Sequence, residues 1–284
     1  MCLSVNFSVH DKRSLGRDLL PKMSDARKNT SRYRSWGSTE DGQIEFESLS
    51  DKTLEGAINV LRKGFFLREA VCICVELNSE PGASEELEEL CLHAAKDGVS
   101  VVAVDIVTKE VVGVAFNKIQ VNSNSSEKSF FEQFSDNCKY QSSKALIDFM
   151  INVDLQIDLF KHYSVDCIFE IMFLATLPTH GKQRVGEMLV ASSLELAKEL
   201  RRDKNVRTPV TIHGNDEVSN ANAVPTLTSA IMTSDYSYRI AKKLHFDVLV
   251  ETTYDKFEYN GKKYNEKLNQ DHQKCALVAK RLTI

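Results

Sequence analysis

The sequence lacks the features that would direct it into a membrane, onto a nucleic acid or into the secretory pathway. No uninterrupted apolar run reaches the roughly 18 residues of a membrane-spanning helix. The first residues do not combine a basic segment with a long apolar one, as secretory signals do. Lysine and arginine (36) do not outnumber aspartate and glutamate (40), which leaves no basic excess to neutralise phosphates. We therefore expect neither a membrane nor a nucleic acid as a partner.

The motifs of metal and nucleotide chemistry are also missing. The sequence has no H-x-x-x-H pair, no Walker loop and no dinucleotide-binding glycine fingerprint. Its 7 cysteines are odd in number and several lie within apolar stretches, which is typical of reduced thiols in a core. Cys72 and Cys74 form a C-x-C pair without a second pair, which favours core residues over metal ligands. These observations predict a cytoplasmic protein without a metal, and we expect a monomer.

The 284 residues fit one domain preceded by a tail. Residues 1–40 show no sustained hydrophobic period, and residues 11–34 are polar and basic, which predicts a flexible basic N-terminal tail. A transit peptide is the alternative, but three aspartates in this stretch, Asp11, Asp18 and Asp25, argue against it. Residues 41–284 then form the folded domain.

Hydrophobic periodicity in the domain predicts strands and helices that do not alternate regularly. Period-two or continuous apolar runs predict strands at 43–47, 99–106, 111–116, 167–174, 230–233, 246–257 and 276–282. Helical spacing of apolar residues predicts helices at 54–65, 84–98, 146–160, 185–200 and 236–244. Polar residues 201–228 predict a long loop. This order indicates an α/β protein with a mixed central sheet flanked by helices.

One turn is a candidate phosphate site. Residues 180–186 (HGKQRVG) lie between a buried strand and a helix. A helix N-terminus presents N–H groups without helical partners and a partial positive charge, and both suit a phosphate or pyrophosphate. Lys182 and Arg184 would add positive charge. The same pattern also fits an ordinary strand-turn-helix unit with basic residues in its turn.

Four segments, in order along the chain, carry a resemblance to a known family. They are residues 63–69 (KGFFLRE), 158–200 beginning DLFKHYSVD, 233–246 (TSDYSYRIAKKLHF) and 276–282. Together they resemble the insect arylalkylamine N-acetyltransferase-like family of the GNAT superfamily over residues 43–284. The resemblance implies the GNAT (acyl-CoA N-acyltransferase) fold. It also implies transfer of an acetyl group from acetyl-CoA to a small primary amine of the arylalkylamine or polyamine type.

The resemblance assigns roles to individual residues, each with a structural alternative. Glu69 aligns with the general base, which acts through a water; the alternative is an exposed glutamate at a helix end. Thr233 and Ser237 align with two serines that assist catalysis, and Ser237 would protonate the thiolate or position the amine; the alternative is helix capping. Tyr236 would contact the cofactor or act as the acid, or it is a core aromatic. The remaining cofactor residues lie on the central strand, for the acetyl and pantetheine groups, and in the following turn, for the pyrophosphate: Leu174, Ala175, Thr176, Gly181, Lys182, Gln183, Arg184, Val185 and Gly186.

The sequence departs from the family pattern in the cofactor loop and beside the base. In the loop pattern Q/R-x-x-G-x-G/A, Gly181 stands at the first position and Arg184 at the middle glycine. A glycine there lets the backbone approach the pyrophosphate, whereas an arginine would clash with it or pair with it. Arg68 replaces the family's aspartate before the glutamate. A second hypothesis is therefore a catalytically impaired GNAT-fold protein that binds CoA or another protein; a third is a protein N-acetyltransferase.

Overall fold

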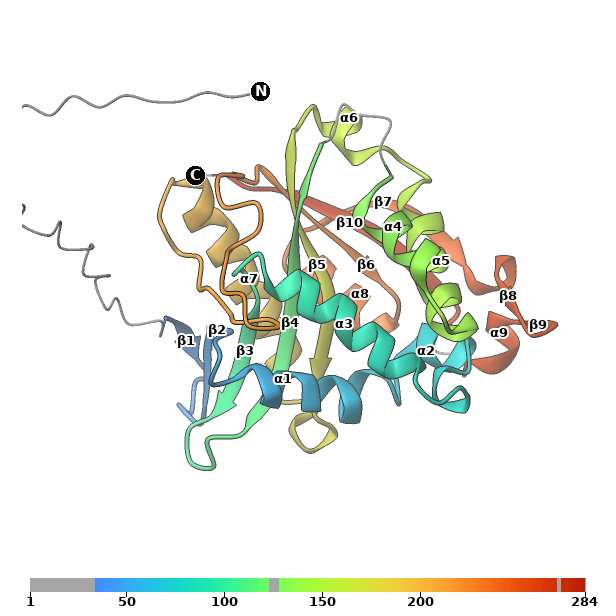
Figure 1. The fold of residues 1–284 in the computed structure, drawn as a ribbon, viewed down its shortest axis with the longest axis horizontal. Coiled ribbons are helices and arrows are strands. Elements are labelled where there is room, and N and C mark those ends of the chain that lie inside the picture. The colour runs from blue at the N-terminus through green and yellow to red at the C-terminus, as the bar shows by residue number, and fades with distance from the viewer. Residues whose placement is uncertain (1–33, 123–127, 270–271, 284) are drawn as a thin grey trace, which may run out of the picture. The chain divides into compact units, whose positions relative to one another are not determined.

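A mixed sheet of eight strands organises the chain (Figure 1). The computed structural model describes residues 34–122, 128–269 and 272–283. The strands follow the order β1-β2-β3-β4-β5-β6-β10-β7, and every neighbouring pair is antiparallel except β5 and β6. The strands are β1 (Ser35–Ser38), β2 (Ile44–Ser48), β3 (Val101–Asp105), β4 (Val111–Val121), β5 (Cys167–Thr176), β6 (Leu227–Met232), β7 (Asp247–Thr253) and β10 (Lys274–Arg281). The predicted mixed α/β sheet is confirmed.

Helices cover both faces of this sheet. They are α1 (Leu54–Val60), α2 (Ala70–Cys74), α3 (Ala83–Ala95), α4 (Phe130–Asn137), α5 (Gln141–Asp154), α6 (Leu159–Tyr163), α7 (Val185–Arg201), α8 (Asp235–Lys243) and α9 (Tyr264–Lys267). Between β7 and β10 the chain forms a small separate hairpin of β8 (Glu258–Tyr259) and β9 (Lys262–Lys263). Among the described residues, no helix has the length and apolar character needed to cross a bilayer.

Several elements differ from the sequence-based predictions. The helix predicted at 146–160 is two helices, because the Asp158 side chain accepts the Lys161 N–H at 3.0 Å and starts α6 as a new helix. The helix predicted at 54–65 is α-helical only to Val60 and continues as a π-helical turn, Leu61–Phe65. The strand predicted at 230–233 begins earlier, at Leu227. Strand β1 lies within the segment predicted as a tail, and residues 1–33 of that segment lie outside the described residues.

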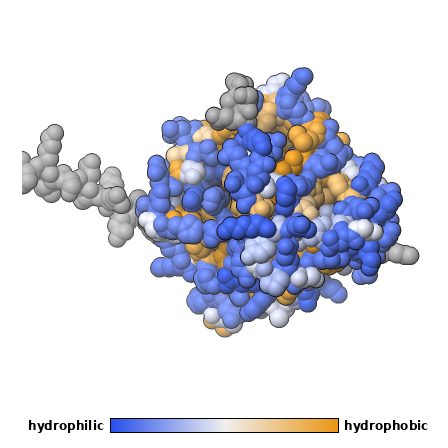
Figure 2. Space-filling model, turned by 45° about the vertical axis from the view of Figure 1, so that its right-hand side comes forward, coloured by the Kyte–Doolittle hydropathy of each residue, from blue (hydrophilic) through white to orange (hydrophobic). Residues whose placement is uncertain are grey.

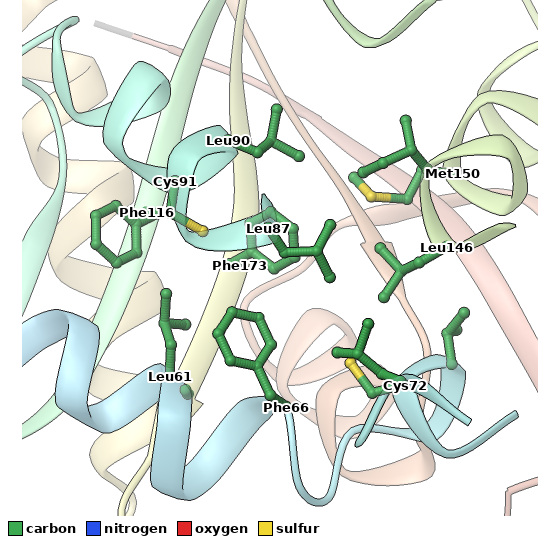
Figure 3. Packing of buried hydrophobic residues seen from close by; sticks show 14 of the residues in the cluster. Leu61, Phe66, Cys72, Leu87, Leu90, Cys91, Phe116, Leu146, Met150 and Phe173 are labelled. Carbon is green, nitrogen blue, oxygen red and sulfur yellow. The ribbon is translucent and has the colours of Figure 1, made fainter. Parts of the chain in front are cut away.

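Among the described residues, the two largest of three hydrophobic clusters lie on opposite faces of the sheet. The larger core joins the sheet to the segments from α1 to α5, and Figure 3 shows its side chains converging from α3, α5 and the π-helical turn. Phe116 of β4 and Phe173 of β5 belong to this core. The second core packs α7 and α8 against the other face, through Val185 and Leu189 among others. Most of the surface on the face shown in Figure 2 is hydrophilic, with smaller hydrophobic areas between.

The long loop between α7 and β6 packs closely onto the domain. Thr208 in this loop donates its N–H to the Gly98 carbonyl at 2.9 Å. Gly98 has φ +67°, and a Cβ there would lie 2.9 Å from the Thr208 carbonyl oxygen. Glycine is therefore required at this position both by the backbone conformation and by the close approach of the loop.

A buried carboxyl group lies beside the larger core. Gln120 of β4 donates to Glu170 of β5 at 2.8 Å, and Glu170 is buried. Burial raises the pKa of Glu170 from 4.5 to about 7, against the opposing effects of Gln120 and Lys118. Burial and the charge of Glu170 also raise the pKa of Asp154, at the end of α5. Both shifts favour the protonated, uncharged form of these two carboxyl groups in the folded protein.

This arrangement predicts that stability falls with rising pH. Because the folded-state pKa of Glu170 lies above its unfolded value, its stabilising contribution is full below pH 4.5 and is lost as the pH rises through about 7. Glu170→Gln removes the ionisation and should flatten this decline, making the variant more stable than wild type at pH 8.5 by on the order of 2 kcal/mol. Urea unfolding at pH 5 and pH 8.5 measures the effect. Parallel pH dependences for the two proteins would contradict it.

Candidate active site

The strands β5 and β6 part halfway along their length. They pair in parallel only from Ile168↔Leu227 to Ile171↔Ala230, although β5 continues to Thr176. At the same point β5 carries a bulge, because Phe173 pairs with Phe116 of β4 while Ile171 pairs with the next residue, Asn117. The end of β5 thus keeps β4 on one side and has no strand partner on the other. Its backbone N–H and C=O groups on that side are available to a ligand.

A cavity of about 350 Å³ lies at this parting. It collects residues from segments that are far apart in the sequence, which line it as follows: Gly64, Phe65, Arg68, Glu69, Ala70, Val71, Leu146, Phe149, Met150, Ile171, Met172, Phe173, Leu174, Ala175, Thr176, Ala230, Ile231, Met232, Thr233, Ser234, Tyr236, Ser237 and His272. The cavity therefore brings together all of the residues predicted for catalysis, the predicted cofactor residues of β5, and Tyr236. The turn residues 181–186 are not part of this lining.

Glu69 has one carboxylate oxygen in use and one without a partner. It is the N-cap of α2, and its Oε2 accepts the Cys72 N–H at 2.8 Å. Its Oε1 is buried and has no hydrogen-bond partner among the described residues. A buried acceptor without a partner is costly, so such groups are uncommon and often mark a site of ligand or water binding. The alternative of an exposed glutamate at a helix end does not describe this geometry.

The two hydroxyl groups predicted to assist catalysis differ in their surroundings. Ser234 and Ser237 form a capping box at the start of α8, in which each side chain bonds the other's backbone N–H at 3.2 Å. The Ser237 hydroxyl also donates to the Ser234 carbonyl at 3.0 Å. Thr233 lies one residue before this box. Ser237 therefore caps the helix and lines the cavity at the same time.

Tyr236 is not a core aromatic. It is 67% exposed, and its ring lies 5.5 Å from the ring of His272 and 5.1 Å from the guanidinium of Arg239. Because it also lines the cavity, its phenol is accessible both to solvent and to a bound molecule. The prediction of a core aromatic is therefore wrong for this residue, whereas its role beside a cofactor stays a prediction.

The turn before α7 fits an anionic group. Arg184 is the N-cap of α7 with φ +62°, and Lys182 also has a left-handed conformation with φ +66°. A left-handed residue followed by a helical one turns successive N–H groups toward one side, which forms an anion-binding concavity. The first backbone bond of the helix is that from Met188 N–H to the Arg184 carbonyl at 3.0 Å, so the N–H groups of residues 185–187 precede the helical bonding pattern. Of the predicted turn residues, Val185 is buried in the second core and contributes backbone only.

The Arg184 side chain turns toward acidic neighbours. Its guanidinium contacts Glu187 at 2.7 Å and Glu40 at 3.7 Å. Glu187, in the first turn of α7, is also paired with Lys243 at 2.9 Å. These pairs neutralise a carboxylate that would otherwise repel a phosphate at the helix start. Arg184 also adopts the left-handed backbone conformation that glycine would supply at this position.

Replacing Arg184 tests this interpretation. Arg184→Gly removes a left-handed non-glycine residue, which relieves roughly 1 kcal/mol, and it loses exposed ion pairs of similar size. We expect stability within about 1 kcal/mol of wild type but several-fold weaker binding of acetyl-CoA, because Glu187 loses one neutralising partner. Isothermal titration at low and high salt measures the affinity. Arg202→Ala, which removes an ion pair with Glu199 at the other end of α7, is the control. Equal affinities for both variants would refute a role for Arg184.

Two residues of the site carried no signal in the sequence. Tyr254, directly after β7, is fully buried, and its hydroxyl donates to the Thr233 carbonyl at 2.7 Å. Burial, and next the charge of Glu69, raise the pKa of Tyr254. His272, two residues before β10, reaches the cavity, and its Nδ1 accepts the Asp235 N–H at 3.5 Å. Both residues come from the segment between β7 and β10. From the sequence, this segment was predicted only as the end of one strand and the connection to the next.

Tyr254 is expected to hold the turn that carries Thr233. Tyr254→Phe keeps the ring, which packs on Phe149 at 6.0 Å, but leaves the Thr233 carbonyl without its donor. We expect a loss of about 1 to 2 kcal/mol in stability and faster amide exchange over residues 233–237. Tyr264→Phe is the control, because Tyr264 belongs to the same aromatic cluster and its hydroxyl bonds no described residue. If both variants exchanged alike over 233–237, this role of Tyr254 would be wrong.

The sheet, the parting of β5 and β6, and the helix that follows β5 define a GNAT-fold protein, and comparison with solved structures supports this class. The chain is similar to arylalkylamine N-acetyltransferase 2 from Aedes aegypti, with 26% identity and a TM-score of 0.68, covering 84% of this chain and 99% of that chain. It also shares the fold of a mosquito arylalkylamine N-acetyltransferase like 5b, with 17% identity, a TM-score of 0.62 and coverage of 84% and 100%. A Drosophila melanogaster polyamine N-acetyltransferase, which forms N-acetylagmatine, has 14% identity, a TM-score of 0.61 and the same coverage. No protein-family model and no curated protein sequence matches the chain.

These structural matches extend across most of the chain and confirm the predicted fold and the resemblance to insect arylalkylamine N-acetyltransferases. Among the described residues, no group of three or more histidine, cysteine, aspartate or glutamate side chains is arranged to hold a metal ion.

Proposed function

We propose that the chain is an N-acetyltransferase that transfers an acetyl group from acetyl-CoA directly to a small primary amine, with Glu69 as the general base. The observation that carries this proposal is Glu69, which lines the cavity where β5 and β6 part and whose buried Oε1 has no hydrogen-bond partner among the described residues. A proton acceptor, an unpaired strand edge and a helix N-terminus are the parts that acyl transfer from a CoA thioester needs.

Each part has a distinct task in this mechanism. Acetyl-CoA supplies the thioester whose carbonyl carbon the amine attacks. Glu69 Oε1 takes a proton from the bound ammonium, directly or through a water, because an amine is mostly protonated at neutral pH. Backbone groups from Leu174 to Thr176 orient the acetyl and pantetheine portion, and the turn 181–186 holds the pyrophosphate. The phenol of Tyr236, or the Ser237 hydroxyl, returns a proton to the leaving thiolate.

The apolar wall of the cavity favours an amine with a hydrophobic or aromatic body. Phe65 and Phe173 lie edge to face at 5.0 Å, and Phe149 and Met150 of α5 complete this side. Glu69 is the one acidic side chain among the described residues that line the cavity. A polyamine would need further acceptors for its distal charges, so we infer an arylalkylamine-type substrate over a polyamine. The free cysteines, most of them buried, fit a reducing compartment, and we propose the cytoplasm.

A second candidate is a GNAT-fold protein that binds CoA without efficient transfer. It is favoured by one observation: the Ser237 hydroxyl is already engaged in the capping box and in a bond to the Ser234 carbonyl. Titration with acetyl-CoA, followed by an assay for thiol release with an amine panel, separates the two. Binding without thiol release would favour this second function, and binding with release favours the enzyme.

Replacing Glu69 tests the base. Glu69→Gln keeps an oxygen to cap α2, so the fold should persist, but it removes the proton acceptor. We expect kcat/KM to fall about 10²- to 10⁴-fold near pH 7, and the deficit to shrink as the pH approaches the pKa of the amine, near 10. Initial rates from pH 6 to pH 10 measure the profile. Glu55→Gln, in an exposed ion pair with Arg62, is the control. A constant deficit at all pH values would remove Glu69 from the proton-transfer step.

A further inference from the structure

An arginine without a partner lies beside the proposed base. Arg68 lines the same cavity as Glu69 and is exposed at its rim. Its side chain makes no hydrogen bond or ion pair with any described residue. By contrast, Arg62, Arg184 and Arg202 each pair with a glutamate at 2.7 Å or less. The ionisable side chains among the described lining residues are those of Arg68, Glu69, Tyr236 and His272. Arg68 is the one guanidinium or ammonium group among them.

The position of Arg68 sets what a bound amine can carry. Its Cα lies about 3.8 Å from that of Glu69, because the two residues are adjacent. An amine nitrogen held at Glu69 Oε1 therefore lies within reach of a long, flexible guanidinium. A guanidinium binds a carboxylate through two parallel hydrogen bonds, and it repels a second ammonium group. The pair of side chains thus suits a substrate with an amine and a carboxylate close together.

We propose that the amine substrate is an α-amino acid with an apolar or aromatic side chain, whose carboxylate pairs with Arg68. This inference rests on the proposed function and narrows it. In an α-amino acid one carbon bears both groups, so the amine faces Glu69 while the carboxylate faces the rim. The side chain then lies against Phe149 and Met150. An amine without a carboxylate leaves the guanidinium hydrated and gains nothing from it.

The transfer step balances as for any amine. The ammonium gives its proton to Glu69, and the neutral nitrogen attacks the acetyl carbon. A C–N bond forms while the C–S bond breaks, and the thiolate leaves with the bonding electron pair and takes up a proton. The tetrahedral nitrogen loses its second proton to solvent. The products are an N-acetyl amino acid and CoA, and no oxidant or further reactant is needed.

Matched substrate pairs test the proposal, because they differ by one carboxylate. L-phenylalanine is compared with phenethylamine, and L-tryptophan with tryptamine, on the full-length protein with acetyl-CoA. We expect wild type to prefer each amino acid by about tenfold or more in kcat/KM, the range for hydrogen bonds to a charged group. Arg68→Gln should remove this preference by raising KM for the amino acid, with KM for acetyl-CoA unchanged. Lys63→Gln is the matched control: it removes the same charge from an exposed residue that does not line the cavity.

The outcomes separate this inference from the proposed function. Turnover of phenethylamine and tryptamine with no preference for the amino acids would overturn the inference and leave the transferase function standing. An Arg68→Gln variant that raised KM only for acetyl-CoA would also overturn it, because the guanidinium would then serve the cofactor. If no amine were turned over, the transferase function would fall. Isothermal titration of the CoA-saturated protein with L-phenylalanine and phenethylamine would still decide which of the two binds more tightly, and equal affinities would refute the inference.

Discussion

The parting of β5 from β6 is the constraint on which the site depends. Parallel pairing ends at Ile171↔Ala230, and the bulge at Met172 changes which face the following residues of β5 present. Phe173 and Ala175 then point into the larger core, and the opposite edge of the strand is left without a strand partner. Continued pairing would have satisfied those backbone groups and closed the cavity. The sheet therefore has fewer internal hydrogen bonds at this point, where the cavity lies.

Glu69 shows how an unfavourable group can be retained within a stable fold. One of its oxygens caps α2, while the other is buried without a hydrogen-bond partner among the described residues. The surrounding wall is held by the segment between β7 and β10, where Lys267 donates to the Cys74 carbonyl at 2.8 Å and ties α9 to the end of α2. The chain thus supports Glu69 from two sides, by the cap at its own position and by a distant segment that fixes the helix it caps.

Sequence patterns predicted the sheet and the helices with strong periodicity, because burial of one face or of a whole strand leaves a clear signal. They could not predict the π-helical turn or the break before α6, since these depend on single caps and on tertiary packing. The predicted catalytic residues converge on one cavity, but the sequence could not distinguish a capping Ser237 from a catalytic one, and the structure places its hydroxyl in the cap and on the cavity lining. Tyr254 and His272 were missed because they act through isolated contacts, Tyr254 with the Thr233 carbonyl and His272 with the Asp235 N–H.

The two halves of the cavity respond differently to sequence change. On the β5 side of the cavity, and in the turn before α7 outside its lining, the proposed contacts use backbone groups, so they depend on backbone conformation more than on side-chain identity; Arg184 has the left-handed conformation there. The half formed by the π-helical turn, α5 and residues 68–69 is built from side chains. Arg68 lies next to Glu69 on that side, so under the proposed mechanism one residue sets the charge near the amine. Structural similarity to acetyltransferases therefore bears on a proposed acyl donor more than on a proposed amine.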